Sequence, residues 1–388
     1  MPLPFILGAL AVAAGGVGAL SGIAGISLTK DANDTVKYAN SRHEKNVERF
    51  EATEKGTQEA MDNLGKLELT ILNSFDTFSD TIERIKNRPY FKPYEKNGVT
   101  LPTYDPEELH AVSVGAGVVL GGLSSAAAGT AGGFAAAGAT TALITTFGTA
   151  STGAAIFGLH GAAATNALLA TLGGGALAAG GGGMALGKIV LGGLMGGAGL
   201  LVGGIIFGVS GALLSEKAEN AKKEMVKAEM KIDMICEYLN NLKDSANQFA
   251  EALKRVNYKY NECYQIIANA VHTDNRCDWY DFTNEERLAT QNTILLVGLL
   301  YNMCKVKLVL KQSEVPDTKN PYKKTEEYYR EEENKARDKF DFDESSVYRI
   351  KADLAGEEIE GENELNVVND EAVNAQIAEA DIVLSDIH

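Results

Sequence analysis

Residues 111–140 read AVSVGAGVVLGGLSSAAAGTAGGFAAAGAT and open a block, residues 111–215, whose only charged side chain is Lys188. These 105 residues hold 29 of the 41 glycines. Because each glycine costs a helix about 1 kcal/mol relative to alanine, helix propensity alone leaves the block unfolded in water. Burial in a bilayer or tight packing against other helices must supply the difference. We expect membrane insertion; the alternative is a soluble Ala/Gly-rich helical core.

Small residues recur at every fourth position in this block. Residues four apart share a helix face, and in lipid such stripes let helix backbones approach closely. A shorter stripe lies in residues 1–29, an uncharged segment long enough to span a bilayer and without the basic start of a cleaved signal. We expect this segment to be retained. The predicted membrane helix-packing residues are Gly18, Gly22, Gly117, Gly121, Gly129, Gly133, Gly196, Gly204 and Gly208.

The clearest periodic pattern follows the block. Apolar residues from Ala218 to Ala270 are separated by alternating steps of three and four, which predicts a coiled-coil helix over residues 216–272. Residues 30–88 predict a second long helix, less regular and bent at its glycines. The predicted fold is all-α, with these two helices paired antiparallel as a coiled coil that flanks the membrane block. The predicted coiled-coil seam is Ile232, Ile235, Leu239, Leu242, Phe249, Leu253 and Val256.

This pairing constrains the membrane topology. If the two long helices pair in that way, both ends of the block lie on one side of the membrane, and the block crosses an even number of times. The predicted spans are residues 112–145 and 184–214. Residues 148–183 fit a turn, a re-entrant hairpin or two further crossings.

The remaining segments have weaker patterns. Residues 89–110 hold four of the eight prolines and predict an extended connector, which ends with Asp105 as N-cap and Pro106 as the first residue of the next helix. Residues 283–311 predict a helix that opens with the capping box TNEE and packs on the coiled coil, since its apolar run is too short to span a bilayer. Residues 312–388 are charged and finally acidic, which predicts partial helix followed by disorder.

Several function classes are disfavoured. A net charge of −16 argues against nucleic acid as a partner. The four cysteines lie far apart without a C-x-x-C pair, which favours reduced thiols. Residues 182–188, GGMALGK, match the first part of a phosphate-binding loop, but Ile189 replaces its Mg²⁺-binding hydroxyl residue and no strand is expected before it. No catalytic or metal-ligand spacing stands out, so we predict no enzyme, no cofactor and no metal site.

Two resemblances follow from these patterns. Long amphipathic helices that flank an apolar block, over residues 30–311, resemble the α-helical pore-forming toxins of the haemolysin and tripartite-enterotoxin type. That resemblance implies a soluble form that hides an apolar hairpin and later inserts it. Residues 148–187 are similar to glycine-zipper stretches of bacterial membrane-associated proteins and of small interferon-inducible glycine-rich membrane proteins, which implies membrane association. The uncharged N-terminus and the acidic tail depart from the toxin pattern.

These features lead to three hypotheses about function. The first is a bacterial effector that inserts into a membrane, forms homo-oligomers through its glycine stripes and permeabilises the lipid bilayer, at the inner or plasma membrane and starting from a soluble precursor. The second is a permanently embedded coiled-coil scaffold or sensor whose acidic tail recruits a protein partner. The third is a soluble helical protein, such as a secreted adhesin or a chaperone-bound precursor.

Overall fold

The structure is a computed structural model, and most of the residues that it describes are helical, as predicted. Within this part of the chain no helix is both long enough and apolar enough to cross a bilayer. Of the predicted helix-packing glycines, all but Gly117 and Gly121 lie outside the described residues, as do the phosphate-loop-like segment and most of the block. The described residues are 30–96, 98–101, 105–123, 138–139, 214–310, 315, 320–358 and 366–387.

The two longest helices are α2 (Lys30–Arg84) and α8 (Leu214–Ala268), each of 55 residues. Helical structure continues through both glycines of α2, so the predicted bend there does not interrupt it. All seven predicted seam residues of α8 are buried. The chain divides into two compact units, to which both long helices contribute. Unit 1 comprises Met1–Lys55, Met195–Asn240 and Lys311–Val367, and unit 2 comprises Gly56–Leu194, Asn241–Leu310 and Val368–His388.

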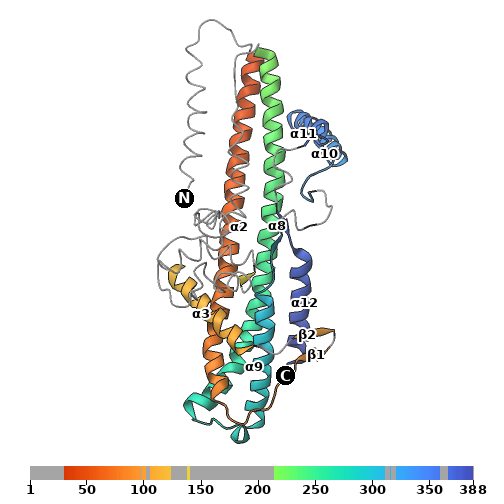
Figure 1. The fold of residues 1–388 in the computed structure, drawn as a ribbon. Helices are drawn as coiled ribbons and strands as arrows, with labels where there is room; N and C mark the ends of the chain where they lie inside the picture. Colours follow the sequence, from red (N-terminus) through yellow and green to blue (C-terminus); the bar gives the residue numbers. More distant parts are fainter. Residues whose placement is uncertain are drawn as a thin grey trace, which may run out of the picture. The chain divides into compact units, whose positions relative to one another are not determined.

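Within each unit, α2 and α8 lie side by side and run in the same direction (Figure 1). Cross-helix partners keep a nearly constant separation in sequence as both numbers rise. In unit 1, Arg42 bonds to Glu229 and Arg49 to Asp233, which are 187 and 184 residues apart.

In unit 2, the hydroxyls of Thr81 and Tyr264 are 3.0 Å apart and belong to residues separated by 183 positions. The predicted antiparallel direction is therefore wrong. A 3-4 spacing selects the buried face of a helix but not the direction of its partner, and residues 85–213 form a connection that is not limited to a short hairpin turn. The expected even number of membrane crossings no longer follows.

The described residues of unit 2 form three further helices: α3 (Pro106–Leu123), α9 (Asn284–Met303) and α12 (Asp370–Asp386). A π-helical turn η4 (Asn269–Thr273) and a 3-10 turn η5 (Trp279–Asp281) lead from α8 to α9. The predicted capping box of α9 is present, with reciprocal bonds between Thr283 and Glu286. Its apolar run, residues 294–301, is largely buried, but the helix ends at Met303, before the predicted boundary.

The proline-containing connector includes regular structure that was not predicted. Strands β1 (Tyr94–Lys96) and β2 (Val99–Leu101) form an antiparallel pair, in which Tyr94 faces Leu101. Gly98 lies between them with φ +81°, a conformation that glycine adopts without strain. The cap at the end of the connector is as predicted, because Asp105 Oδ1 accepts a hydrogen bond of 2.8 Å from the backbone of Glu107.

The described residues of the charged C-terminal region are largely folded into helices, which corrects the prediction of disorder there. It forms α10 (Glu326–Asp338) and α11 (Phe342–Leu354) in unit 1, and α12 in unit 2. A two-stranded sheet joins β3 (Val309–Leu310) and β4 (Val367–Val368). In α12 the side chains of Val373, Ala380 and Val383 are buried. The prediction of disorder rested on the high average charge, and average composition does not show which apolar residues lie on the same face of a helix.

Unit 1 is held together by a buried ionic network beside an apolar cluster. The Lys351 ammonium of α11 lies 2.7 Å from Glu229 and 2.7 Å from Asp233, both on α8. Arg42 of α2 bonds to Glu229 and to Glu344, at 2.5 Å each. Burial alone would raise the pKa of Glu229, but its bond to Arg42 and the charge of Lys351 lower it to about 2. The network therefore ties α11 to both long helices.

Candidate functional site

The first residues of the apolar block lie on α3, which is docked on α2 in unit 2. Ser113 supplies a polar contact: its hydroxyl donates to the carbonyl of Asn73 at 2.7 Å and accepts from the backbone N–H of Asp76 at 3.1 Å. One ring nitrogen of His110 lies 2.9 Å from the Asp76 carboxylate. The buried apolar residues of α3 are Leu109, Val112, Ala116 and Val119. The start of the block thus packs on a surface of α2 in the same chain.

The two described members of the glycine stripe differ in their surroundings. A Cβ atom added at Gly117 would lie 2.6 Å from the amide oxygen of Asn73, so α3 approaches α2 closely at this point. A Cβ atom at Gly121 would meet no atom within 4 Å. Of the two glycines, only Gly117 allows a close approach between helices. The helix that it approaches is α2, a largely polar helix of the same chain, and not a membrane helix as predicted.

A charged cluster fixes the beginning of α3 to the end of α9. The Tyr301 hydroxyl donates a hydrogen bond to Glu108. Lys305 lies 3.8 Å from Glu108 and 3.9 Å from the centre of the Tyr301 ring. Burial, followed by the bond to Glu108, raises the pKa of Tyr301. The phenol stays protonated and remains a donor to Glu108.

Gly138 is a second contact point of the block, and the sequence pattern did not single it out. Its φ is +78°, and an added Cβ would lie 2.5 Å from the carbonyl oxygen of Lys305. Its neighbour Ala139 is fully buried. Glycine is needed here both for backbone conformation and for space. The fourfold spacing of small residues does not indicate which glycine adopts a positive φ, so Gly138 could not be distinguished from the other glycines of the block.

We expect Gly138→Ala to weaken the docking of this segment by about 1–2 kcal/mol, because alanine is strained at positive φ and its methyl overlaps the Lys305 carbonyl. Hydrogen exchange of the α3 amides would measure the loss. The matched control is Gly121→Ala, which adds a methyl in open space and should stabilise α3 by up to about 1 kcal/mol. Equal protection of α3 in the two variants would contradict this assignment.

Unit 2 buries a carboxyl group that has no hydrogen-bond partner. Glu68 of α2 is 0% exposed, and neither carboxyl oxygen has a hydrogen-bond partner. Burial raises its pKa well above the ordinary value, which favours the protonated form of the carboxyl group. The fully buried thiol of Cys304, at the end of α9, interacts with it, and burial followed by Glu68 raises the pKa of that thiol. In the sequence Glu68 resembles the other charged residues of the polar face of its helix, and its burial was not predicted.

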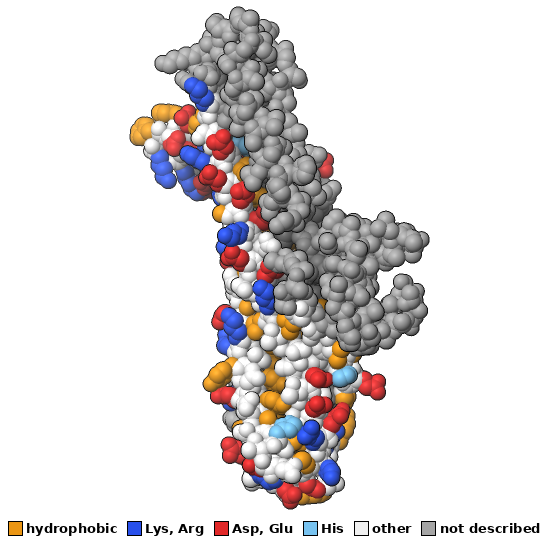
Figure 2. Space-filling view, turned by 90° about the vertical axis from the view of Figure 1, so that its left-hand side faces the viewer, with side chains coloured by type: hydrophobic (Ala, Val, Ile, Leu, Met, Phe, Trp, Pro, Cys, Tyr) orange, Lys and Arg blue, Asp and Glu red, His pale blue; other side chains and the backbone are white. Residues whose placement is uncertain are grey.

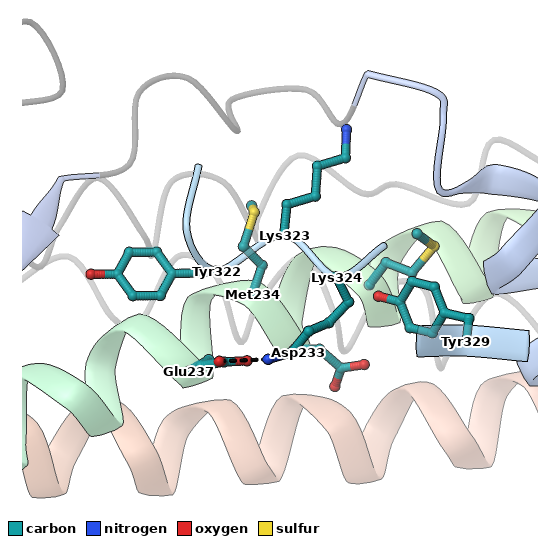
Figure 3. Close-up of a pocket in the computed structure, with 8 residues that line it drawn as sticks. Asp233, Met234, Glu237, Tyr322, Lys323, Lys324 and Tyr329 are labelled. Atoms are coloured by element: carbon teal, nitrogen blue, oxygen red, sulfur yellow. Dashed lines mark hydrogen bonds and ion pairs between the residues drawn. The ribbon is translucent and has the colours of Figure 1, made fainter. Parts of the chain in front are cut away.

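Unit 1 contains a small pocket on α8, between the segment that precedes α10 and the start of α10 itself. Figure 3 shows Tyr322 and Tyr329 on either side of Lys324, whose ammonium lies 2.6 Å from the Glu237 carboxylate. The Tyr322 ring packs edge-on against Tyr238 of α8, with ring centres 5.5 Å apart. These contacts hold the segment against α8.

Metal and thiol chemistry can be assessed for the described residues. They include no group of three or more His, Cys, Asp and Glu side chains placed to hold a metal ion. Each of the four cysteines is a free thiol, and Cys236, Cys263 and Cys304 are buried.

No family model, curated protein or solved structure matches the chain. The resemblances to pore-forming toxins and to glycine-zipper proteins therefore remain predictions.

Proposed function

We propose that the protein inserts the apolar block, residues 111–215, into a membrane, oligomerises there and permeabilises the bilayer. The observation that carries this proposal is that 105 consecutive residues hold a single charged side chain, Lys188. Such a stretch is rare outside membranes, because a bilayer core excludes charge and rewards a long apolar helix. The second reading, a permanently embedded scaffold, shares the insertion but not the release of vesicle contents.

The docked α3 supports a stored state that precedes insertion. The polar residues Glu107, Glu108 and His110 occupy its first turns, and the apolar sequence begins directly after them. Contacts made by Ser113 and Gly117 hold this boundary on α2. Insertion requires these contacts to break, so the interface between α3 and α2 is the proposed latch.

Locking this interface should prevent permeabilisation. We expect the double variant Asn73→Cys and Gly117→Cys to form a disulfide, because the two positions are in direct contact: a Cβ at position 117 would lie 3.7 Å from the side-chain carbon Cγ of Asn73. The oxidised protein should release no dye from liposomes, and a reductant should restore release. Both single-cysteine variants are the matched controls and should respond to the reductant no more than the parent does.

Two outcomes would reject the proposal. Release by the oxidised double variant at the parental rate would show that α3 does not have to leave α2. Absence of release by the parent protein, together with its full resistance to alkaline carbonate extraction from resting cells, would favour the scaffold.

A further inference from the structure

The turn between α10 and α11 in unit 1 presents two phenylalanines to solvent. Phe340 is 80% exposed and Phe342 is 69% exposed. Single exposed apolar side chains are common on proteins, but two large aromatic groups on one short turn form a small apolar patch. Neither side chain contributes to the core of the unit.

The backbone at this turn is one that favours glycine. Helix α10 ends in a Schellman motif, in which the Asp341 N–H donates to the Ala336 carbonyl and the Phe340 N–H donates to the Arg337 carbonyl, both at 3.0 Å. Phe340 occupies the left-handed position of the motif, with φ +57°. A β-carbon is strained there, and glycine is the usual residue. Stability of the fold therefore does not account for a phenylalanine at this position.

The turn stands on a rigid base. The Glu333 carboxylate of α10 accepts from Arg349 of α11 at 2.9 Å and from Arg337 at 2.6 Å. The Arg330 guanidinium bonds to Asp353 at 2.7 Å, which clamps the two helices together a second time. Because these ion pairs already fix the turn, binding of the two rings to a surface costs little conformational entropy.

The charges around the turn are nearly balanced. Lys335, Arg337 and Lys339 are opposed by Asp338, Asp341, Asp343 and Glu344. On the face shown in Figure 2, acidic and basic side chains are likewise interspersed over the described surface. Neither a strongly acidic nor a strongly basic partner is complementary to such a rim, whereas zwitterionic headgroups are.

We propose that the side chains of Phe340 and Phe342 insert into the interfacial region of a zwitterionic bilayer and anchor unit 1 to it. This inference rests on the proposed membrane function and adds a second contact, separate from the apolar block. The rings enter between the headgroups, while the mixed charges of the turn remain in the hydrated layer.

The test compares binding to phosphatidylcholine vesicles for the full-length protein and two variants. Phe340→Gly should raise the thermal midpoint of unfolding, since it removes the strain, and should weaken vesicle binding about tenfold, the loss expected for one interfacial aromatic ring. Adding Phe342→Ser should weaken binding by about a further tenfold. Tyr258→Ser, which removes an aromatic residue that is 67% exposed on α8, is the control and should leave binding unchanged.

The outcomes separate this proposal from the proposed function. If the double Phe variant binds these vesicles as tightly as the parent protein does, the anchor is wrong. If the parent protein does not bind them at low or at high salt, the anchor is also wrong, and the result points to a protein partner. When all proteins are tethered to vesicles through a nickel-chelating lipid, the double variant should release dye as the parent does. A tethered parent that releases nothing would reject permeabilisation, while the free-vesicle comparison would still decide the anchor.

Discussion

Replacing Glu68 with leucine is expected to raise the free energy of unfolding of unit 2 at neutral pH by about 2–4 kcal/mol, because a buried carboxyl without a hydrogen bond is exchanged for an apolar side chain. Burial raises the pKa of Glu68 in the parent chain, and its carboxyl group gains no hydrogen bond in return. Urea denaturation followed by the fluorescence of Trp279, the single tryptophan, would report on unit 2. A Leu variant that is less stable than the parent would show that Glu68 has a partner that compensates its burial.

The same residue predicts a specific dependence on pH. In the unfolded chain Glu68 titrates near its ordinary value of 4.5, whereas in the fold its pKa is raised. The unfolded state therefore loses this proton first, and stability falls as pH rises from about 4.5 towards the raised pKa. Glu68→Gln should remove this slope, while Glu83→Gln, an exposed change on the same helix, should keep it. An unchanged slope in the Glu68→Gln variant would contradict the assignment.

Replacing Lys351 with methionine is expected to lower the free energy of unfolding of unit 1 by about 2–3 kcal/mol. The change leaves Glu229 and Asp233 in a buried network with one cation fewer. Loss of one partner from a buried pair costs about 3–5 kcal/mol, and the value here is lower because Arg42 and Arg49 still contact these carboxylates. Urea denaturation followed by far-UV circular dichroism would measure it.

The matched control for this variant is Lys335→Met, whose ion pairs on α10 are exposed and therefore contribute little to stability. Acid provides a second check. Because the pKa of Glu229 is lowered to about 2 from 4.5, its contribution is complete above about 4.5 and is lost as the pH falls towards 2. Equal destabilisation by the two lysine variants would show that the buried network contributes no more than surface pairs do.

Local chemistry made several elements predictable. The 3-4 spacing of α8 identified the seam residues that are buried, and a capping box and an Asp-Pro pair marked the starts of α9 and α3. These signals depend on residues within one or two turns of each other, and they are therefore legible in the sequence. The folded α12 escaped prediction because its apolar stripe is short and surrounded by acidic residues.

The less predictable features all depend on residues distant in the chain. The spacing of apolar residues in α8 does not determine the direction of its partner helix, so the parallel direction of α2 and α8 within each unit could not be predicted from it. The buried Glu68 interacts with Cys304, which lies more than 200 residues later in the sequence. The requirement for glycine at position 138 arises from the Lys305 carbonyl. Among the residues that make the contacts of the candidate site, only Gly117 had been singled out from the sequence, and there as a membrane helix-packing residue.

The composition of unit 2 from separated pieces of chain has a consequence for biosynthesis. Residues 111–123 leave the ribosome long before residues 241–310 and 368–388, which complete the unit that receives them. The nascent start of the block therefore emerges after α2, on which it docks, but before the rest of unit 2. Until the rest of unit 2 has been synthesised, the growing polypeptide has to keep this apolar segment from aggregating by other means, such as a chaperone or a nearby bilayer.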